Sequence, residues 1–91
     1  MIDVNPVDEG DPMIFDVTVQ DEDGTSRYKV TMALATYRKL TGGKVNPARC
    51  IQAAFEYLLE RESKESILSN FDITLISAYF PLFGSEFKYY L

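Results

Sequence analysis

The sequence contains no histidine, no tryptophan and a single cysteine, Cys50. Without histidine, a Cys–His nucleophile is excluded, and the common zinc and iron ligand sets are not available. One cysteine cannot form a disulfide within the chain, which favours a reducing compartment. We therefore expect no catalytic residue, no metal and no cofactor. Cys50 is interpreted as a small buried hydrophobic residue.

Long apolar runs are absent as well. No segment approaches the roughly 18 apolar residues that a membrane-spanning helix needs. The first residues, MIDVNPVDEGDP, have neither the basic region nor the apolar region of a secretory signal. These features predict a cytoplasmic protein that does not enter a membrane.

Positive charge is absent from residues 1–26, whereas residues 27–49 contain basic side chains and no acidic ones. The basic block could bind an anion or a nucleic acid, or it could lie near the acidic segment and be partly neutralised by it. A net charge of -5 and a pI near 4.5 disfavour nucleic acid. The candidate residues are Arg27, Lys29, Arg38, Lys39, Lys44 and Arg49.

The 91 residues suffice for one domain, and 46% of them are hydrophobic, as in ordinary globular proteins. Residues 1–12 combine acids with Pro6, Gly10 and Pro12, which predicts an acidic flexible arm. Residues 13–91 are then the single domain.

Two segments, Met13–Gln20 and Arg27–Leu34, alternate apolar with polar residues, as half-buried strands do. Asp23-Gly24 between them is a turn signal. We expect an antiparallel hairpin. The outer edges of two such hairpins could pair to form a four-stranded sheet in a homodimer.

A helix is predicted from about Pro47 to Glu62. Asn46 can cap it, Pro47 suits its first turn, and its apolar stripe is Ile51, Ala54, Phe55, Leu58 and Leu59. Shorter helices are expected at 35–40, at 64–69 and at 73–80, the last capped by Asp72, whereas residues 82–91 fit no single pattern. The fold class is α+β: an N-terminal antiparallel β-hairpin packed on one long amphipathic helix and two or three short helices.

The segment TGGKVNPARC (41–50) does not match a Walker-type phosphate loop, because Val45 follows Lys44 where Ser or Thr is required. Its glycines are interpreted as the stop of one helix and Asn46-Pro47 as the start of the next. Lys44 and Arg49 beside a helix N-terminus could still hold an anion.

Aromatic residues concentrate at the end of the chain, where they could form a protein interface or complete the core. The interface candidates are Tyr79, Phe83, Phe87, Tyr89 and Tyr90.

From Tyr28 to Pro81, the segments RKLTGG (38–43), AAFEYLLERESKESIL (53–68) and FDITLISAYFP (71–81) resemble a family of small uncharacterised bacterial proteins. The resemblance implies a small, single-domain, cytoplasmic bacterial protein and transfers no catalytic residue.

We therefore predict a small non-catalytic interaction or regulatory protein that acts through protein association, as a homodimer or with an unknown partner protein. The alternative is anion or nucleic-acid binding through the basic block.

Overall fold

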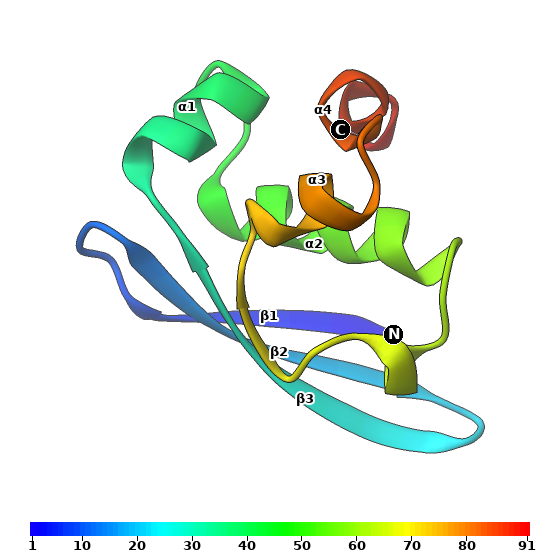
Figure 1. Ribbon diagram of the computed structural model, residues 1–91. Coiled ribbons are helices and arrows are strands. Elements are labelled where there is room, and N and C mark those ends of the chain that lie inside the picture. The colour runs from blue at the N-terminus through cyan, green and yellow to red at the C-terminus, as the bar shows by residue number, and fades with distance from the viewer.

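A computed structural model, which describes residues 1–91, shows a four-stranded sheet with all of its helices on one face (Figure 1). The strands follow one another in the order β1-β2-β3-β4; the first three are antiparallel, and β4 is parallel to β3. This confirms the α+β class. The elements are β1 (Ile2–Asp8), β2 (Met13–Asp21), β3 (Gly24–Met32), α1 (Leu34–Thr41), α2 (Pro47–Leu59), the 3-10 helix η1 (Lys64–Ser66), β4 (Asn70–Asp72), α3 (Leu75–Tyr79), α4 (Phe83–Glu86) and the 3-10 helix η2 (Phe87–Tyr90).

The predicted hairpin is present as β2 and β3. The two strands pair from Met13 opposite Met32 to Asp21 opposite Gly24, so a two-residue loop connects them. Gly24 has a φ of 123°, which residues with a side chain rarely adopt. The Asp23 amide donates a hydrogen bond of 2.8 Å to the Asp21 carboxylate, which holds the loop closed.

The expected flexible arm is wrong for Ile2–Asp8, because these residues form strand β1 beside β2. Ile2 and Val4 lie opposite Val19 and Val17 on the core side, while Asp3 lies on the other face of the sheet. The acids of this segment therefore occupy outward or loop positions and do not oppose strand formation.

Strand β1 also changes the expected dimer, because its pairing leaves no free edge on β2. The other edge of the hairpin is covered at 29–31, where β4 pairs with β3. Met1 and Gln20 exchange both backbone hydrogen bonds, and this alternation directs the backbone nitrogen of Pro6 away from β2. Pro6 therefore places a position without an N–H on the free edge of the sheet.

Helix α2 begins as predicted: Asn46 caps it by accepting a 2.8 Å hydrogen bond from the Arg49 amide, and Pro47 is its first residue. The helix has 13 residues and ends at Leu59, so the long helix to Glu62 is not observed. The amides of Arg61 and Glu62 both donate to the Leu58 carbonyl, which turns the chain out of the helix. The charged residues after Leu59 offer no further apolar stripe for the sheet to bury.

Helix α1 confirms the short helix expected before the glycine pair. It ends at Gly42, whose φ of 65° is left-handed and whose amide donates to the Arg38 carbonyl at 2.8 Å. The glycines therefore stop this helix, as predicted.

After α2 the chain returns to the sheet. The expected helix 73–80 is shorter, and the residues before it form strand β4. Backbone hydrogen bonds from Lys29 to Ser69 and from Ile73 to Thr31 hold β4 beside β3. Asp72 lies in the strand, and its carboxylate accepts hydrogen bonds from the amide and hydroxyl of Thr74.

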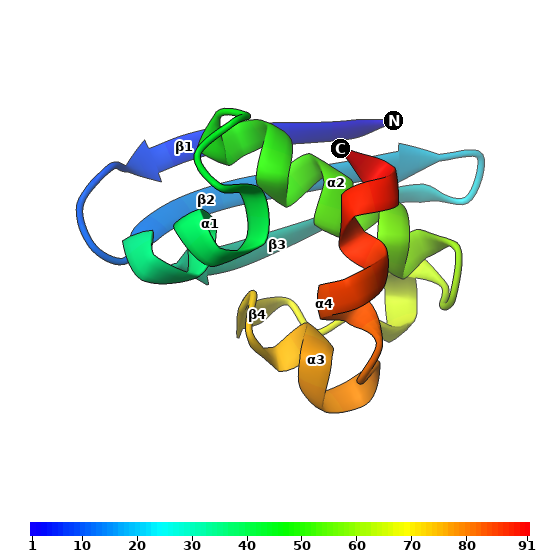
Figure 2. The same cartoon turned by 90° about the horizontal axis from the view of Figure 1, so that it is seen from above.

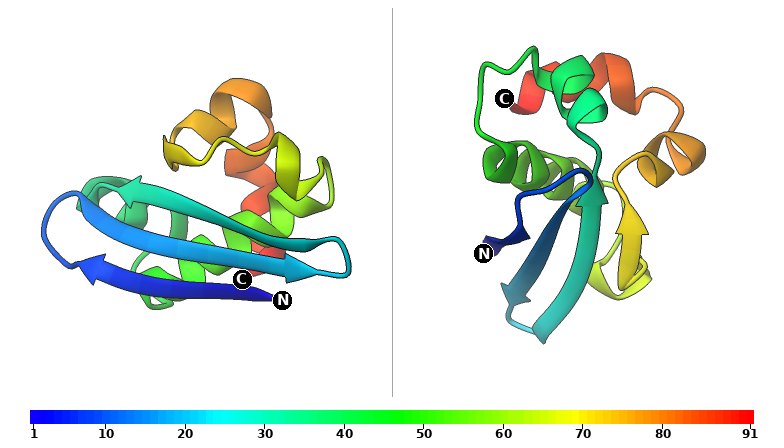
Figure 3. Two further views of the ribbon diagram at one scale, coloured as in Figure 1. Left: turned by 90° about the horizontal axis from the view of Figure 1, so that it is seen from below. Right: turned by 90° about the vertical axis from the view of Figure 1, so that its left-hand side faces the viewer.

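Residues 83–90 form α4 and η2, which cross over α2 on the side away from the sheet (Figure 2). Phe83 and Phe87 are buried in the core, where their rings pack on each other and Phe83 packs on Tyr57 of α2. The other face of the sheet has no helix over it (Figure 3). None of the helices combines the length and hydropathy needed to cross a membrane.

Candidate functional site

The basic block does not form one surface. Arg27 and Lys29 lie on the open face of the sheet, where Asp16 is the cross-strand neighbour of Lys29 and Asp3 lies on the next strand. These side chains are exposed and form no ion pair with one another. Acidic and basic side chains therefore alternate across this face.

Arg38 and Lys39 lie in the last turn of α1, and Lys44 follows the glycine pair. Basic side chains at this end of a helix stabilise its carbonyl groups and macrodipole. This role accounts for their position without a ligand.

Arg49 is held by the protein itself. Its guanidinium forms a 3.2 Å ion pair with Glu56 and donates a 2.6 Å hydrogen bond to the backbone carbonyl of Tyr90. The predicted anion-binding role of Arg49 at the start of α2 competes with these contacts, which join α2 to the end of the chain.

The five aromatic interface candidates divide into three groups. Phe83 and Phe87 are each 1% exposed, so the prediction that they form an interface is wrong: they complete this chain's own core. Tyr90 is half-buried and hydrogen-bonded within the chain, whereas Tyr79 and Tyr89 are 66% and 79% exposed.

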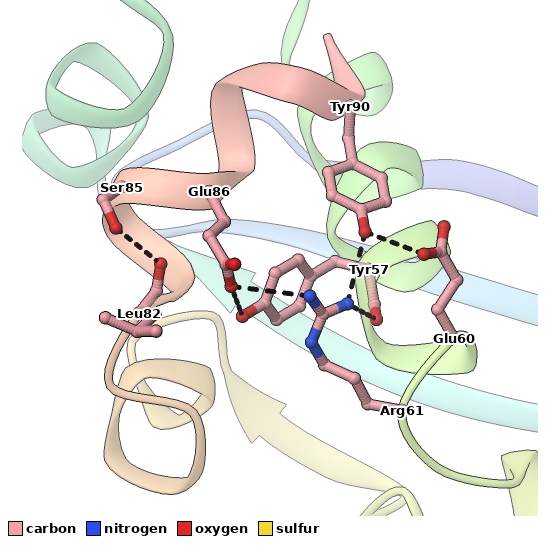
Figure 4. Close-up of polar contacts among 7 residues, drawn as sticks. All are labelled: Tyr57, Glu60, Arg61, Leu82, Ser85, Glu86 and Tyr90. Atoms are coloured by element: carbon pink, nitrogen blue, oxygen red, sulfur yellow. Dashed lines mark hydrogen bonds and ion pairs between the residues drawn. The ribbon is translucent and has the colours of Figure 1, made fainter.

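A polar cluster, which we call the α2–C-terminal junction, consists of Tyr57, Glu60, Arg61, Glu86 and Tyr90 (Figure 4). The Arg61 guanidinium carbon lies 3.5 Å from the centre of the Tyr57 ring. Glu86 accepts hydrogen bonds from the Tyr57 hydroxyl at 2.9 Å and from Arg61 at 3.4 Å. Tyr90 accepts from Arg61 at 3.2 Å and donates to Glu60 at 2.9 Å.

The electrostatics of this junction match a structural role. Burial, and then the hydrogen bond to Glu86, raise the pKa of Tyr57 above its ordinary value. The hydrogen bond with Tyr90 raises the pKa of Arg61. Both groups therefore keep their neutral-pH protonation states, and every side chain in the cluster already has a partner.

Lys64 is a buried lysine that sequence reasoning missed. Its side chain is 3% exposed, and its ammonium lies 2.8 Å from an Asp21 oxygen and 2.6 Å from a Glu65 oxygen. Hydrogen bonds to these carboxylates raise the pKa of Lys64 above its ordinary value. A lysine nucleophile or base needs a lowered pKa, so this residue serves as an anchor between η1 and the hairpin.

Cys50 confirms its predicted role as a buried hydrophobic residue. Its thiol lies 3.7 Å from the sulfur of Met32 and is fully buried. Burial raises the pKa of Cys50 to about 12, so it is a thiol and not a reactive thiolate at neutral pH.

An apolar groove of about 220 Å³ lies between the end of α2, the segment that leads into β4, and α3. Eight of its ten lining residues are hydrophobic. At its rim, Leu68 and Tyr79 are 52% and 66% exposed. The lining residues are Leu58, Glu62, Ser66, Ile67, Leu68, Phe71, Leu75, Ile76, Tyr79 and Phe80.

The chemistry of the groove is that of apolar contact. Glu62 is its one charged lining residue, and the Glu62 carboxylate forms no hydrogen bond or ion pair within the chain. Acid–base catalysis generally uses paired titratable groups with different environments, and this lining offers a single carboxylate. The groove can hold apolar side chains beside one negative charge.

Of the residues that line the groove, only Tyr79 was predicted from the sequence to belong to an interface. The other walls of the groove depend on the parallel pairing of β4 with β3, which brings Phe71 and the preceding Ile67-Leu68 beside α2. The helix predicted at 64–69 is only partly present, because Lys64–Ser66 form a 3-10 helix and Ile67 is extended. Neighbouring residues of an extended chain face opposite sides, so Ile67 is buried and Leu68 is exposed at the rim.

We compared the chain with models of protein families, with characterised proteins and with solved structures, and no match was found. The resemblance to small bacterial proteins, carried by residues 28–81, therefore stays a prediction.

Proposed function

We propose that this protein is a non-catalytic interaction protein that binds a partner protein through the groove. The observation that carries this proposal is the apolar groove itself, with Leu68 and Tyr79 exposed at its rim. Exposed apolar groups around a concave apolar surface are typical of protein interfaces, and tyrosine is enriched at their energetic centres.

A role in association also agrees with the chemistry of the rest of the molecule. The pKa values of the buried groups Lys64 and Cys50 are both raised. At neutral pH the lysine is therefore charged and the cysteine is a neutral thiol, and neither is a nucleophile. The polar groups of the junction are bonded to one another. A cytoplasmic location is part of the proposal, because a lone cysteine suits a reducing compartment.

Anion or nucleic-acid binding through the basic block has weaker support. Arg27 and Lys29 share their face of the sheet with acidic residues, and Arg49 is bonded to Glu56 and Tyr90. Long-range repulsion between this acidic chain and phosphates acts against it too.

Site-specific photo-crosslinking in the cells that naturally produce this protein tests the proposal. A photoreactive residue at position 79 should form a discrete protein adduct, because this side chain stands at the groove. The same residue at position 89 is the matched control, since Tyr89 is even more exposed than Tyr79 and lies outside the groove. Equal adducts at both positions, or none at position 79, would contradict the proposal.

A further inference from the structure

We propose that the groove binds a short segment of a partner protein that inserts an apolar side chain and sets a lysine or arginine against Glu62. This inference rests on the proposed function and defines the chemistry of its partner. Three features support it: the small size of the groove, its apolar lining, and the absence of a counterion for Glu62 within the chain.

The groove has the size of side chains and not of a cofactor. Small-molecule sites usually enclose about 300–1,000 Å³. The groove measures about 220 Å³ and is open to solvent beside Leu68 and Tyr79. Leu75 and Phe80 are further apolar walls. It therefore accommodates one or two apolar side chains of a polypeptide that lies across the surface.

Glu62 supplies the charge requirement. The two basic residues nearest to it in sequence are already engaged: Arg61 with Glu86, and Lys64 with Asp21 and Glu65. No basic residue lines the groove. A cation on the partner would therefore pair with a carboxylate that has no counterion within the chain, in surroundings where apolar walls reduce screening.

A second copy of this chain is a poorer occupant. Two grooves that meet about a two-fold axis would bring one Glu62 toward the other, and like charges in an interface oppose association. Among the exposed basic residues, Arg27 and Lys29 lie on the open face of the sheet, opposite the helices, so their use would require a head-to-tail contact. Such contacts form rings or open chains and not a closed dimer.

Selection from a displayed library of random peptides tests the inference without presuming a sequence. The bait is the full chain, and peptides that also bind the Leu68→Ser/Tyr79→Ala variant are removed. We expect the remaining peptides to combine an aliphatic or aromatic residue with Lys or Arg. The Leu82→Ser/Tyr89→Ala variant is the matched control, because both residues are exposed outside the groove, and it should retain the peptides.

The charge is then tested directly on the best peptide. Replacing its basic residue with Gln should weaken binding about two- to fivefold, as for a solvent-accessible ion pair, and added salt should reduce the difference. Glu62→Lys should weaken the basic peptide at least as much. Glu22→Lys changes the net charge equally but lies in the hairpin loop, so binding should be retained. Equal urea midpoints for all variants show that folding is intact.

Each outcome decides one point. If no peptide depends on Leu68 and Tyr79, the proposed function and this inference both fail. If groove-dependent peptides lack basic residues, or bind Glu62→Lys as well as the original chain, the inference fails and the proposed function stands. If sedimentation shows a dimer that Leu68→Ser/Tyr79→Ala abolishes, the occupant is a second copy and the inference is overturned.

Discussion

The C-terminal half of the chain makes two different surfaces with the end of α2. At the α2–C-terminal junction, Arg61, Glu86 and Tyr90 bond to one another and to α2 (Figure 4). At the groove, Tyr79 is exposed and Glu62 has no partner. Both surfaces contain aromatic residues from one short stretch, so aromatic content does not distinguish an interface from a core.

Among the aromatic residues of the C-terminal stretch 79–91, those before Pro81 line the groove, and those after it lie over α2 or beside the junction. Before Pro81, the short helix α3 ends at Tyr79, whose side chain lines the groove. After Pro81, α4 and η2 lie across α2 and bury Phe83 and Phe87. Because proline cannot continue a helix, it allows the chain to change direction here. The difference between the surfaces is therefore one of backbone path.

The largest expected contrast is between Phe87 and Tyr79. Phe87→Ala should lower the free energy of unfolding by about 3–5 kcal/mol, because it removes a fully buried ring from the core. Tyr79→Ala should change it by less than about 0.5 kcal/mol, since the ring is exposed. Urea unfolding followed by circular dichroism measures both. A comparable loss for Tyr79→Ala would show that the groove belongs to the core.

Arg61 should show the next largest effect. Arg61→Met removes the contact over the Tyr57 ring and the hydrogen bonds to Tyr90 and Glu86, and we expect a loss of about 1–2 kcal/mol in the same measurement. Arg27→Met is the control: Arg27 is exposed on the open face of the sheet and forms no ion pair or ring contact, so the change should stay below about 0.5 kcal/mol. Equal losses for the two variants would show that the contacts of Arg61 at the junction do not stabilise the fold.

Glu86 and Glu62 should differ by a smaller amount in their contribution to the free energy of unfolding. Glu86→Gln weakens the hydrogen bonds from Tyr57 and Arg61 and should cost about 1 kcal/mol. Glu62→Gln should leave the free energy of unfolding unchanged within about 0.5 kcal/mol, because no contact within the chain is lost. Destabilisation by Glu62→Gln in urea unfolding would mean that Glu62 supports the fold.

The smallest expected effect is a change in how stability depends on pH when Lys64 is replaced. Lys64 lies just before the residues 66–68 that line the groove. Hydrogen bonds from Lys64 lower the pKa of Asp21 and of Glu65, so the folded chain binds fewer protons than the unfolded chain near pH 4. This stability is present above the ordinary carboxylate pKa and is lost as pH falls through the lowered values. Urea midpoints between about pH 5 and pH 3 should therefore fall less steeply for Lys64→Met.

Lys29→Met is the matched control for this measurement, because Lys29 forms no ion pair. Its acid dependence should equal that of the unchanged chain. If the urea midpoint of Lys64→Met falls with pH as steeply as that of the unchanged chain, the pairing with Lys64 does not stabilise the charged carboxylates of Asp21 and Glu65.

Elements that carry their own local signals could be predicted from the sequence. The hairpin follows from alternation around a glycine turn, the start of α2 from Asn46-Pro47, and the end of α1 from Gly42. Each signal lies within a few residues of the structure that it specifies. Local chemistry was therefore sufficient for these parts of the fold.

The remaining parts depend on partners distant in the sequence. Strand β4 has three residues and exists because Lys29 and Thr31 supply its hydrogen bonds. Strand β1 was obscured by its acids and Pro6; the alternation of Asp3 with Ile2 and Val4 indicates a strand once β2 is present. The groove follows from β4, so it could not be predicted before that pairing was known.

Pro6 has a consequence for the molecule in concentrated solution. Fibrillar assembly extends a sheet from one molecule to the next through an uninterrupted ladder of donors and acceptors. On the free edge of β1, Pro6 removes a donor, and the shift in register between Pro6 and Asp8 distorts the strand beyond it. Strand β1 thus completes one side of the sheet and interrupts the ladder of donors there, which disfavours lateral polymerisation through this edge.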